Sequence, residues 1–150
     1  MEWVKQEDAQ GCAIAVAAMM CGLAYQEAKA HFLKRQTDAG KRCIGGYEFH
    51  EFLKGRGWDY VFYACRYRTY SSLGKSQTQT WPPSRERLFE EEGLDLVSCH
   101  VMPAPGSDLA HAVLMLPDGR IMDPERSDPV ASLDFYPETL YVTGWKKIPI

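Results

Sequence analysis

The sequence lacks the features of membrane, nucleic-acid-binding and zinc-binding proteins. The uncharged run at residues 12–26 holds only about a dozen apolar residues, whereas a membrane span needs roughly 18 or more. There are 17 Lys and Arg against 20 Asp and Glu, a net charge of −3, with no basic patch for a nucleic acid. No CxxC or HxxxH spacing is present. We therefore expect neither membrane nor nucleic acid as a partner, and no metal or organic cofactor.

A secretory signal and a disulfide framework are also missing. No basic segment precedes the first apolar run, and Glu2, Glu7 and Asp8 carry the wrong charge for a signal peptide. The 5 cysteines are an odd number without close pairing. These features predict a protein of the reducing cytoplasm with free thiols.

The length of 150 residues predicts one domain, residues 1–150. Its first part favours helices. Residues 12–24 are apolar on every side and predict a buried helix that ends at Gly22, followed by an amphipathic helix from Tyr25 and a short helix that ends at Gly55. Alternation and β-branched residues then predict strands at 58–64, 94–102, 110–116, 120–123 and 139–148. Helices first and an antiparallel sheet afterwards give an α+β fold.

A long connection separates the first two predicted strands. Residues 66–83 are polar and end in Trp81-Pro82-Pro83, which predicts a long loop able to act as a flap. Ser84 follows as the expected N-cap of a short helix through Glu92.

Cys12 stands at the first position of the predicted buried helix. There the unpaired backbone N–H groups and the positive end of the helix dipole favour a thiolate, which is the nucleophilic form. The side-chain amide of Gln6 is close enough in sequence to turn back toward the sulfur. Together with the Cys12 N–H it would form a two-donor oxyanion hole for acyl transfer.

His111 and Asp123 supply a base and a group to orient it, provided that a hairpin brings them together. A three-residue loop at 117–119 places Asp123 opposite Val113, one diagonal step from His111 on the same face of the sheet. A two-residue loop would turn Asp123 to the other face. Because Gly suits the last, left-handed position of the longer loop, the sequence favours the arrangement in which Asp123 reaches His111.

Several alternatives remain open at this point. His100, beside Cys99 near a strand end, is a rival base, and Asp128 before Pro129 is a rival orienting group. Cys12 itself could be an ordinary core cysteine, since free cysteine is among the most buried residue types. The remaining cysteines are interpreted as buried or incidental thiols: Cys21, Cys43, Cys65 and Cys99.

These residues resemble a known family. Gln6, then Cys12 opening a hydrophobic helix, then a distant strand His111 followed by Asp123-Pro124 is similar to the papain-like cysteine peptidases, and most similar to their bacteriocin-leader-processing branch. The order of elements agrees over most of the chain, and motif identity lies in residues 6–20 and 111–124. The resemblance implies a papain-like core with Gln6 as oxyanion donor, Cys12 as nucleophile, His111 as base and acid, and Asp123 as its orienting group.

The expected activity is hydrolysis of a peptide or other amide bond, in a peptide or protein substrate, through a thioester acyl-enzyme. Two alternatives are an acyl transferase, deamidase or isopeptidase that uses the same site, and an interaction module that has the fold without the chemistry.

Overall fold

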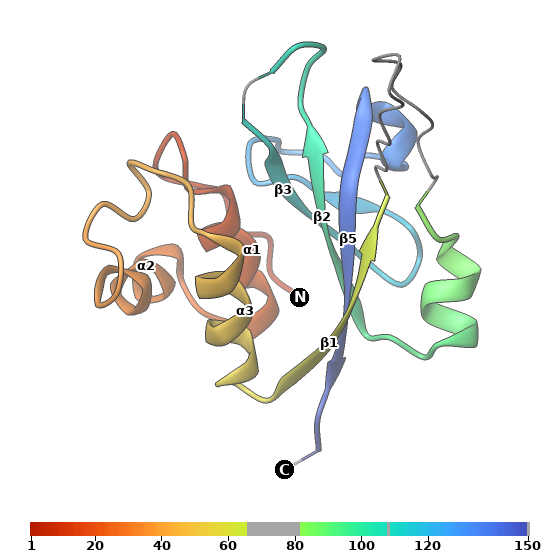
Figure 1. The fold of residues 1–150 in the computed structure, drawn as a ribbon, viewed down its shortest axis with the longest axis horizontal. Helices are drawn as coiled ribbons and strands as arrows, with labels where there is room; N and C mark the ends of the chain where they lie inside the picture. The colour runs from red at the N-terminus through yellow and green to blue at the C-terminus, as the bar shows by residue number, and fades with distance from the viewer. Residues whose placement is uncertain (66–81, 108, 150) are drawn as a thin grey trace, which may run out of the picture.

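The helices come first and the sheet follows, as the α+β class predicts (Figure 1). The computed structural model describes residues 1–65, 82–107 and 109–149. The helices are α1 (Cys12–Cys21), α2 (Tyr25–Leu33) and α3 (Gly46–Lys54). The strands are β1 (Trp58–Ala64), β2 (Leu96–Met102), β3 (His111–Met115), β4 (Ile121–Met122) and β5 (Glu138–Lys147). Two short helices complete the fold, η1 (Glu86–Glu91) and η2 (Leu133–Phe135).

All strand pairs in the sheet are antiparallel, in the order β1-β5-β2-β3-β4. The strand that comes last in the chain, β5, therefore lies between β1 and β2. It pairs with β1 from Trp58 opposite Lys147 to Ala64 opposite Tyr141. Because β5 lies inside the sheet, beside the edge strand β1, the two edges of the sheet are β1 and β4.

Each face of the sheet carries its own hydrophobic core. Helices α1, α2 and α3 cover one face, where Leu114 and Trp145 of the sheet pack against the helices (Figure 1). On the other face, Val113 and Val142 pack with Leu88 from η1. Alternate residues of a strand point to opposite faces, so the same strands supply both cores.

Helix α1 is buried over nearly its whole length, as its unbroken apolar sequence predicts. It ends at Gly22, whose φ of 65° is the left-handed conformation that glycine adopts without steric cost. The predicted end of the helix at Gly22 is therefore confirmed.

The hairpin between β3 and β4 has the predicted register. Leu114 lies opposite Met122, and Leu116 donates its N–H to the carbonyl of Arg120 at 2.9 Å. Gly119 has a φ of 91°, the left-handed value expected at the end of a three-residue loop. The strand β4 is shorter than predicted, since its pairing ends at Met122.

The helix predicted after Ser84 forms, with the Ser84 hydroxyl accepting from the N–H of Arg87 at 3.2 Å. It is a π-helix over Glu86–Glu91 rather than an α-helix. Of the flap expected at residues 66–83, residues 66–81 lie outside the part that the structure describes. Within the described residues, no helix is long and apolar enough to cross a lipid bilayer.

Candidate active site

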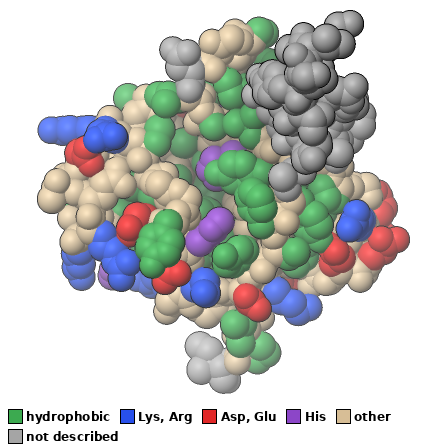
Figure 2. Space-filling view, in the orientation of Figure 1, with side chains coloured by type: hydrophobic (Ala, Val, Ile, Leu, Met, Phe, Trp, Pro, Cys, Tyr) green, Lys and Arg blue, Asp and Glu red, His purple; other side chains and the backbone are tan. Residues whose placement is uncertain are grey.

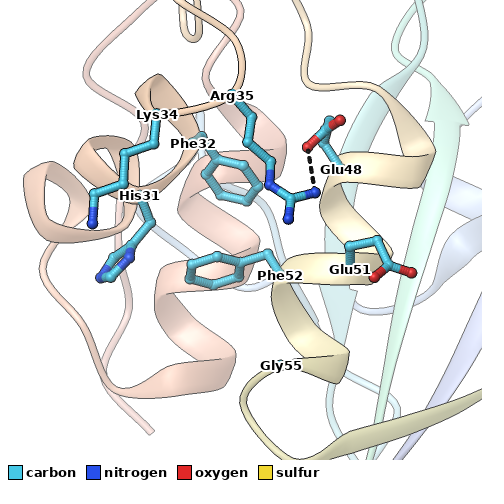
Figure 3. Close-up of a pocket in the computed structure, with 8 residues that line it drawn as sticks. All are labelled: His31, Phe32, Lys34, Arg35, Glu48, Glu51, Phe52 and Gly55. Atoms are coloured by element: carbon cyan, nitrogen blue, oxygen red, sulfur yellow. Dashed lines mark ion pairs between the residues drawn. The ribbon is translucent and has the colours of Figure 1, made fainter.

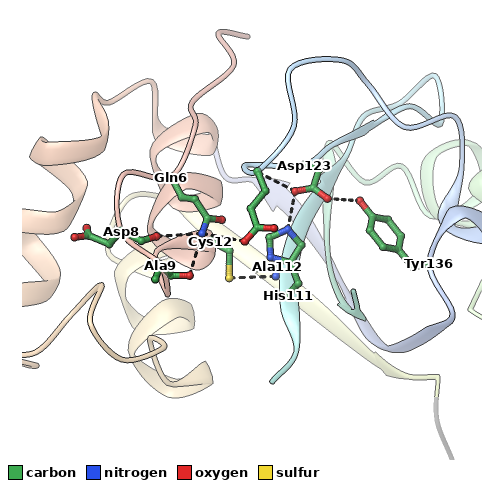
Figure 4. A network of polar contacts seen from close by, with 9 residues as sticks. Gln6, Asp8, Ala9, Cys12, His111, Ala112, Asp123 and Tyr136 are labelled. Carbon is green, nitrogen blue, oxygen red and sulfur yellow. Dashed lines mark hydrogen bonds and ion pairs between the residues drawn. The ribbon is translucent and has the colours of Figure 1, made fainter. Parts of the chain in front are cut away.

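Cys12 is the first residue of α1 and points to the junction between the helices and the sheet (Figure 4). Its side chain is almost buried, with the residue 7% exposed. The backbone N–H of Ala112 on β3 donates to the Cys12 sulfur at 3.3 Å. The sulfur therefore faces the beginning of β3, where the predicted base is located.

His111, the first residue of β3, forms a buried pair with Asp123. The His111 Nε2 donates to the Asp123 Oδ1 at 2.6 Å, and both side chains are less than a tenth exposed. Because Nε2 is engaged by the carboxylate, Nδ1 is the ring nitrogen left for another partner, and His111 lies close enough to Cys12 for the sulfur to raise its pKa. Figure 4 shows the three side chains together: the imidazole is hydrogen-bonded to the carboxylate, and the sulfur accepts from the N–H of Ala112, the residue after His111.

The electrostatics of the pair favour a positively charged imidazole. Burial lowers the pKa of His111, but hydrogen bonds to Asp123 and Cys12, together with their negative charges, outweigh it and raise the pKa to about 10. Burial raises the pKa of Asp123, but hydrogen bonds from His111, Tyr136 and the Glu125 N–H bring it below the usual value. A positively charged imidazole beside the Cys12 sulfur is the charge state that supports a thiolate nucleophile.

Gln6 lies beside the site, but its amide is already engaged. Its backbone N–H donates to the carbonyl of Pro124 at 3.1 Å, which fixes the segment before α1 next to Asp123. Its Nε2 donates to the carbonyls of Asp8 and Ala9, both at 3.1 Å, and contacts the Glu125 Oε1 at 3.3 Å (Figure 4). The predicted turn toward the sulfur is therefore replaced by contacts within the 6–9 loop and with Glu125.

Close packing explains the glycine that precedes the cysteine. A Cβ on Gly11 would lie 1.9 Å from the hydroxyl oxygen of Tyr25, which no side chain could tolerate. The same hydroxyl donates to the Asp8 carboxylate at 2.7 Å, and Lys29 pairs with Asp8 at 2.9 Å. These contacts brace the loop that leads into α1, so that Cys12 is presented at a fixed place.

The rival residues lie outside this network. His100 is in register with Ala112 on β3, and its ring stacks on Tyr141 at 4.3 Å. Burial, followed by the positive charges of His50 and His111, lowers the pKa of His100 to about 4, which keeps its ring neutral at neutral pH. Asp128 is exposed, whereas Asp123 holds the imidazole of His111.

Tyr136 and Glu125 were not predicted from the sequence, although both contact the site residues. The Tyr136 hydroxyl donates to the Asp123 Oδ2 at 2.7 Å, on the side away from His111. Glu125 donates its backbone N–H to the Asp123 Oδ1 at 2.9 Å. Residue spacing gives no signal for Tyr136, because an irregular segment separates it from β4. For Glu125, the available indication was its position two residues after Asp123 in the sequence Asp-Pro-Glu.

An aromatic surface adjoins Cys12 on the helix-covered face of the sheet. Its members are His50, Tyr60, Phe62, His100 and Tyr141. The His50 ring stacks on Tyr60 at 4.6 Å, while Tyr60 and Phe62 are 40% and 48% exposed. Burial and the negative charge of Cys12 raise the pKa of Tyr141 to about 12. Figure 2 shows hydrophobic and histidine side chains gathered between helices and sheet, with charged groups around them.

Two cavities differ in their chemistry. One, of about 300 Å³, contains Cys12, His111 and Glu125 in its lining. The other, of about 400 Å³, lies between α2 and α3, where an Arg35–Glu48 ion pair at 3.8 Å crosses it (Figure 3). The second contains no cysteine in its described lining. In the described part of the chain, no group of three or more His, Cys, Asp or Glu is placed to hold a metal ion.

No family model and no curated protein sequence matches the chain. A solved structure does: the peptidase domain of Streptococcus ComA, described as a bifunctional ABC transporter involved in a quorum-sensing pathway. The match covers 96% of each chain with a TM-score of 0.58, at 17% sequence identity. The chain has the fold of a peptidase domain. This agrees with the predicted α+β core of helices followed by an antiparallel sheet, and at this identity the relationship is one of fold.

Proposed function

We propose that the protein is a cysteine peptidase that hydrolyses a peptide or amide bond through a thioester intermediate. The observation that carries the proposal is that Cys12, His111 and Asp123, which are far apart in the sequence, come together: Asp123 binds the His111 ring, and the N–H of the adjacent Ala112 binds the Cys12 sulfur. A peptidase-domain fold agrees with it. The proposed substrates are peptides or proteins.

In the proposed reaction, the Cys12 thiol has already given its proton to His111, and the sulfur attacks the carbonyl carbon of the substrate as a thiolate beside the imidazolium. The negative charge moves to the carbonyl oxygen, where the Cys12 backbone N–H stabilises it, since the first N–H groups of a helix have no acceptor within the helix. The carbon–nitrogen bond then breaks, and His111 returns the proton to the leaving nitrogen. Asp123 holds the ring in the orientation that both transfers need.

The second half of the reaction releases the acyl group. His111 removes a proton from water, whose oxygen attacks the thioester carbon. The carbon–sulfur bond breaks, the Cys12 sulfur leaves as a thiolate while His111 keeps the proton taken from water, and a carboxylic acid is released. Gln6 is the proposed second donor to the oxyanion, and it would exchange one of its present acceptors for that oxygen. Its contact with exposed Glu125, at 3.3 Å the longest of the three, is the one most easily exchanged.

Thiol labelling tests the proposed nucleophile. A peptidyl vinyl sulfone should modify Cys12 at least about tenfold faster than Cys21 or Cys43, and His111→Ala should slow this labelling by about a hundredfold, the usual effect of a lost general base. His31→Ala, which removes an exposed histidine of α2, is the matched control and should label at the wild-type rate. Mass spectrometry of the digested protein gives the rate for each cysteine.

The outcomes separate the possible functions. If Cys12 labels no faster than the other thiols and His111→Ala has no effect, the catalytic proposal is wrong and an interaction module remains. If labelling is fast and depends on His111, but no peptide is cut, the acyl group goes to another acceptor, as in a transferase, or the enzyme is a deamidase or isopeptidase.

We also propose a reducing compartment, the cytoplasm, for this chemistry. Cys12, Cys21, Cys43 and Cys99 carry free thiols, and a catalytic thiol requires a reduced sulfur.

A further inference from the structure

The cavity next to Cys12 has mostly uncharged walls. Pro103, Leu109 and Ala110 line it from the segment that precedes His111, and Gln10 lines it from the loop before α1. Among the described residues that line the cavity, Glu125 is the only one that carries an Asp, Glu, Lys or Arg side chain. A substrate group that enters this cavity therefore meets the apolar side chains of Pro103 and Leu109, the imidazole of His111 and one carboxylate.

The position of Glu125 is fixed by the site itself. Its backbone N–H donates to the Asp123 Oδ1 at 2.9 Å, so Glu125 stays beside the His111–Asp123 pair. Its carboxylate extends to the Gln6 amide, with Oε1 to Nε2 at 3.3 Å. The side chain thus lies between the proposed oxyanion donor and the cavity, at the exposed rim of the site.

A carboxylate at this place opposes the proposed reaction unless a positive charge joins it. Attack by Cys12 builds negative charge on the substrate oxygen, and a second negative charge nearby raises the energy of that state. A cationic substrate group would cancel this repulsion. It would also compete with the Gln6 Nε2 for the Glu125 Oε1, which would free an amide N–H for the oxyanion.

We propose that Glu125 selects substrates with a Lys or Arg side chain within one residue of the bond that Cys12 attacks. The apolar walls at Pro103 and Leu109 would cover the aliphatic part of such a side chain, and Glu125 would bind its charged end. The inference rests on the proposed peptidase function. It adds the substrate class and assigns a specificity-determining role to a residue other than Cys12, His111 and Asp123.

Cleavage-site mapping tests the proposal without a known substrate. A peptide library made with an endopeptidase that cuts after Glu keeps Lys and Arg inside the peptides. The full-length protein is incubated with it, and new ends are identified by mass spectrometry, with the cuts made by Cys12→Ala subtracted. We expect Lys and Arg enriched about three- to tenfold next to the cut bonds, which is the range for an ion pair at an exposed rim.

Variants of Glu125 separate charge from hydrogen bonding. Glu125→Gln keeps an oxygen acceptor for Gln6 but loses the charge, so the enrichment should disappear. Glu125→Lys should change the preference to Asp and Glu. Glu91→Gln, an exposed change on η1, is the matched control and should keep the wild-type pattern.

The results distinguish a failure of the inference about Glu125 from a failure of the proposed peptidase function. Cuts that depend on Cys12 but show no Lys or Arg enrichment, or an enrichment that Glu125→Gln leaves intact, would overturn the inference while the proposed function stands. If no cut depends on Cys12, the peptidase function and the inference both fail.

Discussion

At the scale of single residues, Asp123 is held from three sides. Its Oδ1 accepts from the His111 Nε2 and the Glu125 N–H, and its Oδ2 accepts from the Tyr136 hydroxyl. A carboxylate fixed at both oxygens cannot rotate freely, so the imidazole that it holds is fixed as well. Tyr136 is therefore a positioning residue that acts on His111 through Asp123.

Tyr136→Phe tests this role because it removes only the hydroxyl. That hydrogen bond lowers the pKa of Asp123, so its loss should move the pKa upward and shift the acid limb of kcat/KM to higher pH. The stability that comes from a lowered pKa is present above the unfolded value and is lost as the pH falls through the folded value. Acid unfolding should therefore begin at higher pH in the variant, with about 1–3 kcal/mol lost at neutral pH.

The control for this prediction is Tyr47→Phe, since Tyr47 is 69% exposed. A pH–rate profile and an acid-unfolding curve measured for both variants provide the comparison. Identical curves for Tyr136→Phe and Tyr47→Phe would contradict the positioning role.

The candidate site could be predicted from sequence only where the signal is local. Cys12 opens an apolar helix, and the turn between β3 and β4 sets the distance from His111 to Asp123, so spacing alone suffices. Tyr136 reaches Asp123 after an irregular excursion of the chain, for which no periodicity exists. The contacts of the Gln6 amide depend on the same excursion, because Glu125 lies within it.

At the scale of elements, the hairpin loop Pro117–Gly119 decides whether the base has an orienting group. Its three residues set Leu114 opposite Met122, and a one-residue slip would turn Asp123 to the other face of the sheet. The sequence could predict this register because turn type and the two-residue period of strands are both local. The site therefore depends on the geometry of one short loop.

Gly119→Ala should destabilise the protein by about 1–2 kcal/mol, the cost of a left-handed conformation for a residue with a Cβ. The φ of Gly119 is 91°, and a new Cβ would also lie 3.1 Å from the Arg85 Cδ. Urea unfolding measures the change. Gly46→Ala is the control, because its Cβ would meet no atom within 4 Å and alanine favours the helix α3. Equal stability of both variants would refute the predicted strain.

The short helix η1 shows a limit of local prediction. Ser84 and the buried Leu88 predict a helix here, and one forms. Its winding is wider, with the Glu92 N–H donating to the carbonyl of Arg87 at 2.9 Å. An α-helix and one turn of π-helix use the same caps and nearly the same apolar spacing, so the sequence does not distinguish them.

At the scale of the whole molecule, the positions of the strands in the sequence could be predicted. Apart from the β3–β4 hairpin, the pairing of one strand with another could not. Trp58–Ala64 was predicted with its observed bounds, and the C-terminal strand within one residue at each end. Their pairing joins distant parts of the chain, and nothing in either segment encodes the partner. The helices-first order fixes the fold class, whereas the order of strands depends on how the complete sheet packs.

The His111 pair should also make global stability depend on pH. The pKa of His111 is about 10 in the folded protein, above the usual 6.5. A raised pKa contributes stability that is fully present below 6.5 and is lost as the pH rises through 10. The free energy of unfolding should therefore fall between these pH values. Chemical denaturation at several pH values in this range measures the free energy of unfolding. In His111→Gln this free energy should fall less steeply with pH than in the wild-type protein.

Cysteine thiols away from the site, which are exposed on unfolding, titrate in the same range and affect both proteins equally. The difference between wild type and His111→Gln therefore reports the histidine. Parallel curves would show that His111 takes up no extra proton in the folded state.

The position of β5 between β1 and β2 has a consequence during protein synthesis. The ribosome makes α1 long before it makes the strand that lies between β1 and β2. Until β5 emerges, β1 has no neighbour in the sheet and β2 has a partner on one side only. The five-stranded sheet is therefore completed only when the last strand of the chain has been made.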